Sequence, residues 1–177
     1  KELDDYTINR IDDVIDSLLA RQVDGILWAA PEIDDNHAWI DERLEKIPVP
    51  VLFLAMQPRE GVASVSTDNF QGAVMATQHL LDCGRKKIGH ISGQLNWWEA
   101  NERKRGWREA LTAAGFDAPE KYCAEGNWSP TSGEQAFIQL LEAFPDMDAV
   151  FVANDQMALS VLRETRRRGI SVPEQLA

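Results

Sequence analysis

AVFVANDQMAL, residues 149–159, joins an apolar run to a helical pattern through two polar residues. Residues 149–153 are rich in β-branched and aromatic side chains, which is typical of a buried strand. Asn154 and Asp155 are good helix N-cap residues, and Gly169 after three arginines is typical of a helix C-terminus. In open α/β sheets, ligands bind where a parallel strand passes to its helix. Local chemistry alone favours a pure capping role for Asp155 and leaves capping and ligand binding equally open for Asn154.

The alternation of strand and helix continues along the whole chain. Apolar runs of strand length alternate with segments whose apolar residues recur at helical spacing, and the connections are short. This order predicts α/β architecture with a parallel, doubly wound sheet. Strands are expected at 23–29, 49–55, 63–66, 87–92, 122–125 and 149–153, and helices at 8–22, 37–46, 70–82, 100–114, 132–143 and in the segment that Gly169 ends.

Both ends of the pattern are incomplete. The first expected helix has no strand before it, and residues 170–177 lead toward a strand that does not follow. We therefore expect the chain to be truncated at both ends, as a fragment of a larger protein.

Composition excludes several classes of function. The 177 residues carry a formal net charge of −11, which argues against binding of nucleic acid or an anionic membrane by this segment. Apolar runs fall short of the ~20 residues of a membrane span. The two cysteines, Cys83 and Cys123, show neither a disulfide framework nor metal-ligand spacing, which fits a reducing, cytoplasmic compartment.

Enzymatic signatures are also missing from the sequence. The three histidines, His37, His79 and His90, lie far apart and have no metal-ligand spacing, so structural roles are favoured for His79 and His90. We find no nucleophile elbow, P-loop or dinucleotide fingerprint. The sequence predicts a protein that is not an enzyme and needs neither a cofactor nor a metal.

Three predicted strand-to-helix connections carry side chains suited to a sugar. Indole rings pack on the apolar face of a pyranose, while fixed polar groups bind its hydroxyls. One of the paired tryptophans at 97 and 98 is expected to be buried and the other exposed to ligand, and Trp107 is expected to be core. The candidate ligand-binding residues are Trp97, Trp98, Glu99, Arg103, Trp128 and Asn154.

An ordered set of motifs resembles the effector-binding core of lactose-repressor/galactose-repressor (LacI/GalR) family transcription regulators. These motifs are Asp68-Asn69-x-x-Gly72, His79-Leu80-x-x-x-Gly84, Lys87-Ile88-x-x-Ile91-x-Gly93, Arg103-x-x-Gly106-Trp107 and Ala110-Leu111-x-x-x-Gly115. The stretches Gly126-Asn127-Trp128-Ser129 and Val152–Leu159 are closest to the lactose-repressor branch. The resemblance covers essentially the whole chain.

The resemblance implies a periplasmic-binding-protein-like fold of two lobes, with part of the N-terminal lobe at 1–66 and an incomplete C-terminal lobe at 67–177. It implies a regulator that binds a small-molecule sugar effector. Such a regulator binds operator DNA through an N-terminal helix-turn-helix, which is not present in this chain. A sugar-binding protein of an ABC uptake system shares the fold and is the alternative. The Arg103 and Asn154 motifs favour the regulator.

Residue roles follow from the same resemblance. It implies that Arg103 holds sugar hydroxyls, Trp128 stacks on the ligand and Asn154 bonds a hydroxyl. Ala55 stands where the lactose-repressor branch has an acidic ligand contact, so a different sugar, for example a larger or glucoside-like one, is expected. The resemblance also implies a homodimer, whose contact is expected at the helix bearing Met157, Ala158, Val161 and Leu162.

Overall fold

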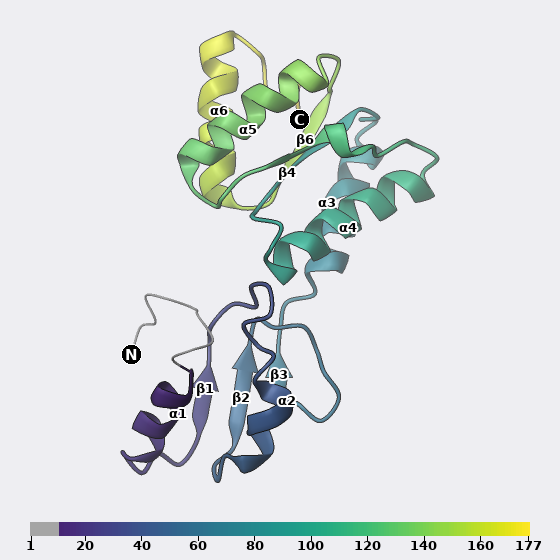
Figure 1. Ribbon diagram of the computed structural model, residues 1–177. Helices are drawn as coiled ribbons and strands as arrows, with labels where there is room; N and C mark the ends of the chain where they lie inside the picture. The colour runs from purple at the N-terminus through teal and green to yellow at the C-terminus, as the bar shows by residue number, and fades with distance from the viewer. Residues whose placement is uncertain (1–10) are drawn as a thin grey trace. The chain divides into compact units, whose positions relative to one another are not determined.

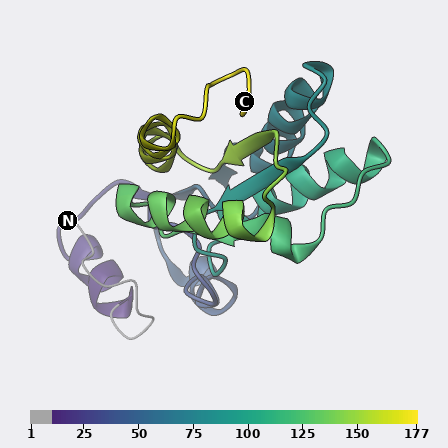
Figure 2. The ribbon, with the colours of Figure 1, turned by 90° about the horizontal axis from the view of Figure 1, so that it is seen from above.

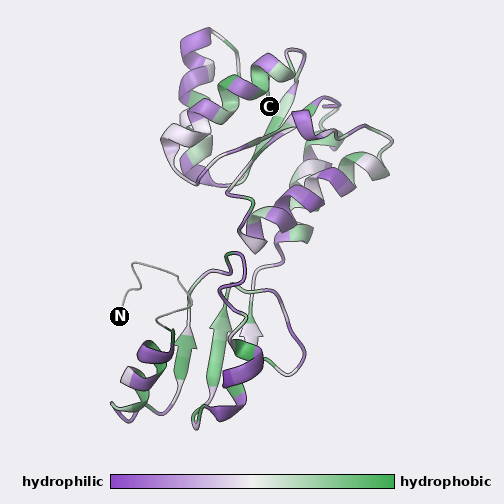
Figure 3. Cartoon of the chain, in the orientation of Figure 1, coloured by the Kyte–Doolittle hydropathy of each residue, from purple (hydrophilic) through white to green (hydrophobic). Residues whose placement is uncertain are grey.

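The chain forms two compact units in the computed structural model, which describes residues 11–177 (Figure 1). The first unit comprises the chain up to Thr67 together with Asn96–Glu99. The second unit comprises Asp68–Leu95 and Ala100–Ala177. Hydrophobic residues line the strands of both units and the helix sides that pack on them (Figure 3).

The first unit is built on a three-stranded parallel sheet in the order β1-β2-β3. Its helices pack apolar side chains onto the sheet, so that Ile15, Trp28 and Phe53 lie in one core. Leu27, between two buried residues of β1, is 71% exposed, as expected when successive side chains point to opposite faces. The elements are α1 (Ile11–Leu19), β1 (Ile26–Trp28), α2 (Ile40–Arg43), η2 (Leu44–Lys46), β2 (Val51–Leu54) and β3 (Ser64–Val65).

The structure corrects one predicted helix of the first unit. A helix was expected at 37–46, but α2 contains four residues and continues as the 3-10 turn η2. The preceding loop is stabilised by Asn36, whose Oδ1 accepts from Ile33 N at 3.0 Å and whose Nδ2 donates to Pro31 O at 2.9 Å. This local bonding competes with helix formation. The helix predicted at 8–22 is observed from Ile11 to Leu19, and its first residues lie outside the described part.

The second unit has β4 at the centre of a parallel sheet with order β5-β4-β6. Figure 2 shows its helices on both sides of the strands. The connection after β4 leads to one side of the sheet, and the connection after β5 crosses to the other. The elements are α3 (Asn69–Asp82), β4 (Ile88–Ser92), α4 (Trp98–Ala113), η3 (Glu120–Tyr122), β5 (Cys123–Glu125), α5 (Pro130–Ala143), β6 (Ala149–Val152) and α6 (Asp155–Arg168).

Each face of this sheet has its own core. Ile91 packs with Phe137 and Met157 from α5 and α6. Ile88, two positions from His90, packs with Trp107 of α4, whose Nε1 donates to Ile88 O at 3.1 Å. The prediction that Trp107 belongs to the core is therefore confirmed, since it is fully buried. Burial of both faces is the expected condition of a parallel sheet.

The predicted ends of α6 are confirmed. Asn154 is the N-cap, and its Oδ1 accepts from Met157 N at 2.9 Å. Gly169 ends the helix at φ 70°, a left-handed conformation that glycine adopts without steric cost. The pure capping role that local chemistry favoured for Asp155 is wrong, because Asn154 is the cap and Asp155 is the exposed first residue of the helix.

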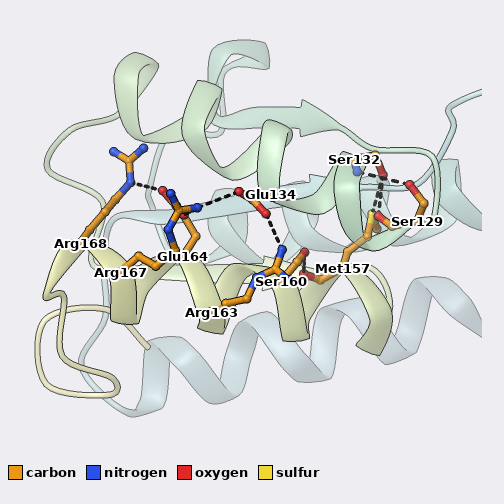
Figure 4. A network of polar contacts seen from close by, with 9 residues as sticks. All are labelled: Ser129, Ser132, Glu134, Met157, Ser160, Arg163, Glu164, Arg167 and Arg168. Atoms are coloured by element: carbon orange, nitrogen blue, oxygen red, sulfur yellow. Dashed lines mark hydrogen bonds and ion pairs between the residues drawn. The ribbon is translucent and has the colours of Figure 1, made fainter.

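A row of alternating charges ties α6 to α5 (Figure 4). Glu134 of α5 accepts from Arg163 at 2.6 Å and from Arg167 at 3.1 Å. Arg167 also meets Glu164 at 2.9 Å, and Arg168 meets Glu164 at 2.6 Å. The arginines are largely exposed, so each pair contributes little to stability. Of these pairs, those of Glu134 join the two helices, whereas those of Glu164 lie within α6.

Candidate ligand-binding site

Arg103, in the second turn of α4, is held by two hydrogen bonds from different atoms of its guanidinium. Nε donates to Asn69 Oδ1 at 2.9 Å, and Nη1 donates to Ala153 O at 2.7 Å. Asn69 begins α3, and Ala153 directly follows β6. Two anchors on one planar group fix both its position and its rotation.

Trp128 packs closely on the backbone of Gly93. A Cβ added at Gly93 would lie 2.0 Å from Trp128 Cζ2, so the indole occupies the space that any side chain would need. Trp128 has φ 70°, a left-handed backbone conformation that is uncommon outside glycine. Arg103 Cζ lies 5.6 Å from the centroid of the Trp128 ring, a cation–π distance.

Asn154 links the α6 N-terminus to Trp128. While Oδ1 caps the helix, Nδ2 donates to Trp128 O at 3.0 Å. A primary amide has two N–H donors and two acceptor lone pairs, so one of each remains for a ligand hydroxyl. The capping role that local chemistry allowed for Asn154 is therefore real, and it leaves capacity for binding.

These contacts form a closed circuit at the carboxyl edge of the β5-β4-β6 sheet. Arg103 contacts Asn69, Ala153 and Trp128. Asn154 closes the circuit, because it directly follows Ala153 and its side chain donates to Trp128 O. Gly93, Trp128 and Ala153 follow β4, β5 and β6, respectively. The circuit thus brings together a guanidinium cation, an indole ring and a side-chain amide. These groups are suited to binding a polyol that has an apolar face.

The remaining predicted residues, Trp97, Trp98 and Glu99, group with the first unit. Trp97 forms an antiparallel bridge with Ile33, and Trp98 N donates to Glu32 O at 3.1 Å. Both tryptophans are half-buried, as is Glu99. The expectation that one tryptophan is buried and the other exposed is therefore wrong.

His90 lies in β4 behind the circuit and is fully buried. Its ring stacks between Phe151 at 4.9 Å and Trp107 at 5.6 Å, and Nδ1 lies 2.8 Å from Phe151 O. Burial lowers the pKa of His90 to about 4, and the nearby charges of Lys104 and Arg103 act in the same direction. His90 is therefore neutral at physiological pH and serves as an aromatic core residue.

Other reactive groups do not converge within the described part of the chain. Among residues 11–177, no group of three or more His, Cys, Asp or Glu side chains is placed to hold a metal ion. Burial raises the pKa of the Cys123 thiol, which disfavours a nucleophilic thiolate. In the same residues, none of the helices has the length and apolarity needed to cross a membrane.

Comparison with known protein families shows to which family the chain belongs. The family described as periplasmic binding proteins and sugar binding domain of LacI family matches residues 4–177. The chain belongs to this family. It therefore has the periplasmic-binding-protein-like fold of parallel sheets and alternating helices that the sequence motifs implied.

The curated relatives of this LacI-family chain are transcriptional regulators. It is 35% identical to catabolite control protein A of Priestia megaterium over 92% of the chain and 49% of the relative. It is 37% identical to the HTH-type transcriptional regulator CelR of Thermobifida fusca over 90% of the chain and 47% of the relative. The chain thus spans about half the length of these relatives.

Solved structures of LacI-family regulators superimpose on the chain. A transcriptional regulator CelR–cellobiose complex matches with a TM-score of 0.81 and 36% identity, covering 94% of this chain and 51% of that one. A sugar-binding LacI-family regulator from Escherichia coli, complexed with phosphate, matches with a TM-score of 0.85 and 28% identity, covering 94% of this chain and 59% of that one.

The predicted dimer-contact residues divide into two groups. Met157 and Val161 are buried in the core shared by α5 and α6, so the expectation that they lie at a contact between chains is wrong. Ala158 is half-buried, and Leu162 is 48% exposed. Leu159, which was not predicted, is 68% exposed, so Leu159 and Leu162 form the open apolar side of α6.

Sequence reasoning missed Asn69 as a member of the circuit. It appeared only as part of a family motif, and it lies 34 positions from its partner Arg103. One local signal was available: Asp68 caps α3 by accepting from Gln71 N at 2.8 Å, so the following asparagine was not needed as a cap.

Proposed function

We propose that this chain is the effector-binding and dimerisation core of a LacI-type transcription regulator that senses a sugar in the cytoplasm. The observation that carries the proposal is the circuit of Arg103, Trp128 and Asn154 at the carboxyl edge of a parallel sheet. Its curated relatives are regulators rather than enzymes, which supports this function over transport or catalysis. In this proposal the two units are the two lobes of the effector-binding domain.

The roles of the three circuit residues differ. The fork of N–H donors on Arg103 holds adjacent hydroxyls, and its anchors keep the fork oriented. Trp128 offers an indole face for the C–H face of the sugar ring. Asn154 supplies its remaining donor and acceptor to one hydroxyl. Trp97, Trp98 and Glu99 remain predicted ligand contacts.

A glucoside-like disaccharide is the first effector class to test. The relative CelR is named in a complex with cellobiose and is 36% identical over 94% of this chain. Ala55 supplies no carboxylate where the lactose-repressor branch has an acidic contact, which removes a basis for galactoside selectivity. Another relative, the ribose operon repressor of Escherichia coli at 32% identity, makes ribose the monosaccharide for comparison.

Titration calorimetry on the full-length protein tests the binding site. A panel containing cellobiose, other disaccharides and ribose identifies the effector, and the affinity is then measured for the variants. Arg103→Ala removes hydrogen bonds from a charged donor, so we expect a loss of roughly tenfold to a hundredfold, or about 1.5–3 kcal/mol. Arg103→Lys does not restore binding, since an ammonium lacks the planar fork. Trp128→Phe is milder than Trp128→Ala, because a smaller aromatic face remains.

Arg108→Ala is the matched control for Arg103→Ala. It removes another arginine of α4, one that pairs with Glu120 at 2.6 Å and is 42% exposed. We expect sugar affinity to be unchanged in this variant. If Arg103→Ala and Asn154→Ala bind the sugar as tightly as the original protein, the proposed site is wrong.

We further propose that the full-length protein is a homodimer with α6 at the contact. Leu159 and Leu162 expose apolar surface on this helix. Beside them lies a surface hollow of about 530 Å³ lined by Pro130, Gln156, Leu159, Ser160 and Arg163. Exposed apolar patches that are hollowed and rimmed by polar groups are typical of contacts between proteins.

Operator DNA is proposed to bind the remainder of the full-length protein rather than this segment. The formal net charge of −11 opposes binding to phosphates, and the relatives named as HTH-type regulators are about twice as long. A gel shift at physiological salt with the 177-residue chain should show no complex with DNA. A salt-sensitive complex formed by this chain alone would contradict the assignment.

A further inference from the structure

Asn69 occupies an unusual place for an asparagine. It is the first residue of α3, yet it does not cap the helix, because Asp68 performs that function. Its residue surface is only 4% exposed. Burial of an amide costs free energy unless its polar atoms are hydrogen-bonded. The bond from Arg103 Nε to Asn69 Oδ1, at 2.9 Å, therefore offsets a burial that the helix itself does not require.

This bond acts on the orientation of the Arg103 guanidinium. Nε is the atom about which the guanidinium plane turns relative to the aliphatic stem, and Asn69 holds its N–H in one direction. Ala153 O holds Nη1 at 2.7 Å, at the other side of the same plane. The two acceptors therefore hold the same plane at two of its nitrogen atoms.

We propose that Asn69 is a positioning residue for effector binding: it presets the guanidinium plane of Arg103 before the sugar arrives. This inference rests on the proposed function, since it requires that Arg103 binds the sugar. Presetting a donor fork reduces the ordering cost of binding, which is the general advantage of preorganised sites. Asn69 itself does not touch the sugar in this mechanism.

The variants Asn69→Leu and Asn69→Asp distinguish the effect of the hydrogen-bond acceptor from the effect of side-chain volume. Leucine fills about the same space without an acceptor, whereas aspartate keeps an oxygen that accepts from Nε. In calorimetry on the full-length protein with its identified sugar, we expect Asn69→Leu to weaken binding roughly tenfold. We expect Asn69→Asp to stay within about threefold of the original affinity. Equal loss in both variants would overturn the proposal.

A double-mutant cycle provides the readout that a purely structural role would not move. In the Arg103→Ala background, Asn69 has no guanidinium to orient, so Asn69→Leu should cause no further loss of affinity. The same loss in both backgrounds would show that Asn69 acts through the fold and would overturn the proposal. Gln71→Leu, an exposed change two positions along α3, is the control and should leave binding unchanged.

The outcomes also distinguish this inference from the proposed function. If Arg103→Ala leaves affinity unchanged, the proposed role of Arg103 in binding the sugar fails and Asn69 has no guanidinium to preset. If Arg103→Ala weakens binding but Asn69→Leu does not, the site stands and the positioning role is refuted. Melting temperatures of the sugar-free variants show whether each remains folded.

Discussion

Replacing Gly93 with alanine should damage ligand binding without removing any polar group. Gly93 is buried directly after β4, and atoms of the six-membered ring of Trp128 lie against it. An added Cβ would lie 2.0 Å from Cζ2, 2.1 Å from Cη2 and 2.4 Å from Cε2 of Trp128. These distances are about 1.0–1.4 Å below ordinary contact, so one of the two segments must move.

The indole is the part expected to move, and it cannot do so alone. Trp128 O is bonded to Asn154 Nδ2, and the ring lies below the Arg103 guanidinium. Overpacking of this kind costs about 1–3 kcal/mol of stability. Loss of the correct aromatic stacking costs about 0.5–1.5 kcal/mol of binding, or roughly threefold to tenfold in affinity.

Calorimetry with the identified sugar and thermal unfolding of the sugar-free protein measure the two effects separately. Gly72→Ala is the control, because no atom lies within 4 Å of an added Cβ there and the position is inside α3. Alanine at such a helical position should stabilise by about 0.5–1 kcal/mol and leave affinity unchanged. Unchanged affinity in Gly93→Ala would refute the placement of Trp128 at the binding surface.

Three further predictions concern titration and assembly. The imidazole of His90 should titrate by NMR with a pKa of about 4, so the fold should lose stability as pH falls from about 6.5 toward 4, where the unfolded chain binds a proton that buried His90 does not; a value near 6.5 would show that it is solvated. The Arg168 guanidinium lowers the pKa of the Glu164 carboxyl, so this ion pair stabilises the fold above pH 4.5, and the stabilisation is lost as pH falls through the lowered pKa; Glu164→Gln should therefore lose less melting temperature than the original protein as pH falls below 4.5. Leu159→Asp should convert the full-length dimer to a monomer in sedimentation at micromolar concentration, whereas Gln156→Asp in the same hollow should be milder; a Leu159→Asp dimer would contradict the α6 contact.

Local sequence signals predicted most of the second unit. The Asn154 cap and the Gly169 terminus depend on neighbours within about one turn, and both are observed. The core position of Trp107 is also observed, although its partner Ile88 lies 19 positions away. The alternation of strands and helices along the sequence likewise predicted that Trp128 and Asn154 lie at one edge of the sheet. Their mutual hydrogen bond, in contrast, follows from tertiary packing that periodicity does not encode.

Elements whose side chains serve two neighbours were predicted less well. The apolar residues of α6 were predicted to exceed what the sheet needs and to be available for a dimer contact. Met157 is instead buried against α5. The packing is close, since an added Cβ at Gly133 of α5 would lie 2.6 Å from Met157 Cβ. The contact of Asn69 with Arg103 joins residues 34 positions apart and depends on how α3 meets α4. Such contacts require coordinates, because no local pattern distinguishes a buried asparagine from an exposed one.

A crystal structure of the full-length protein with its identified sugar tests the central claim most directly. We predict that the Arg103 guanidinium donates to two adjacent hydroxyls at about 3 Å, while its bonds to Asn69 and Ala153 persist. The sugar ring should stack on Trp128, and Asn154 should bond one further hydroxyl. A sugar bound in the crystal without contact to Arg103, Trp128 or Asn154 would contradict the account.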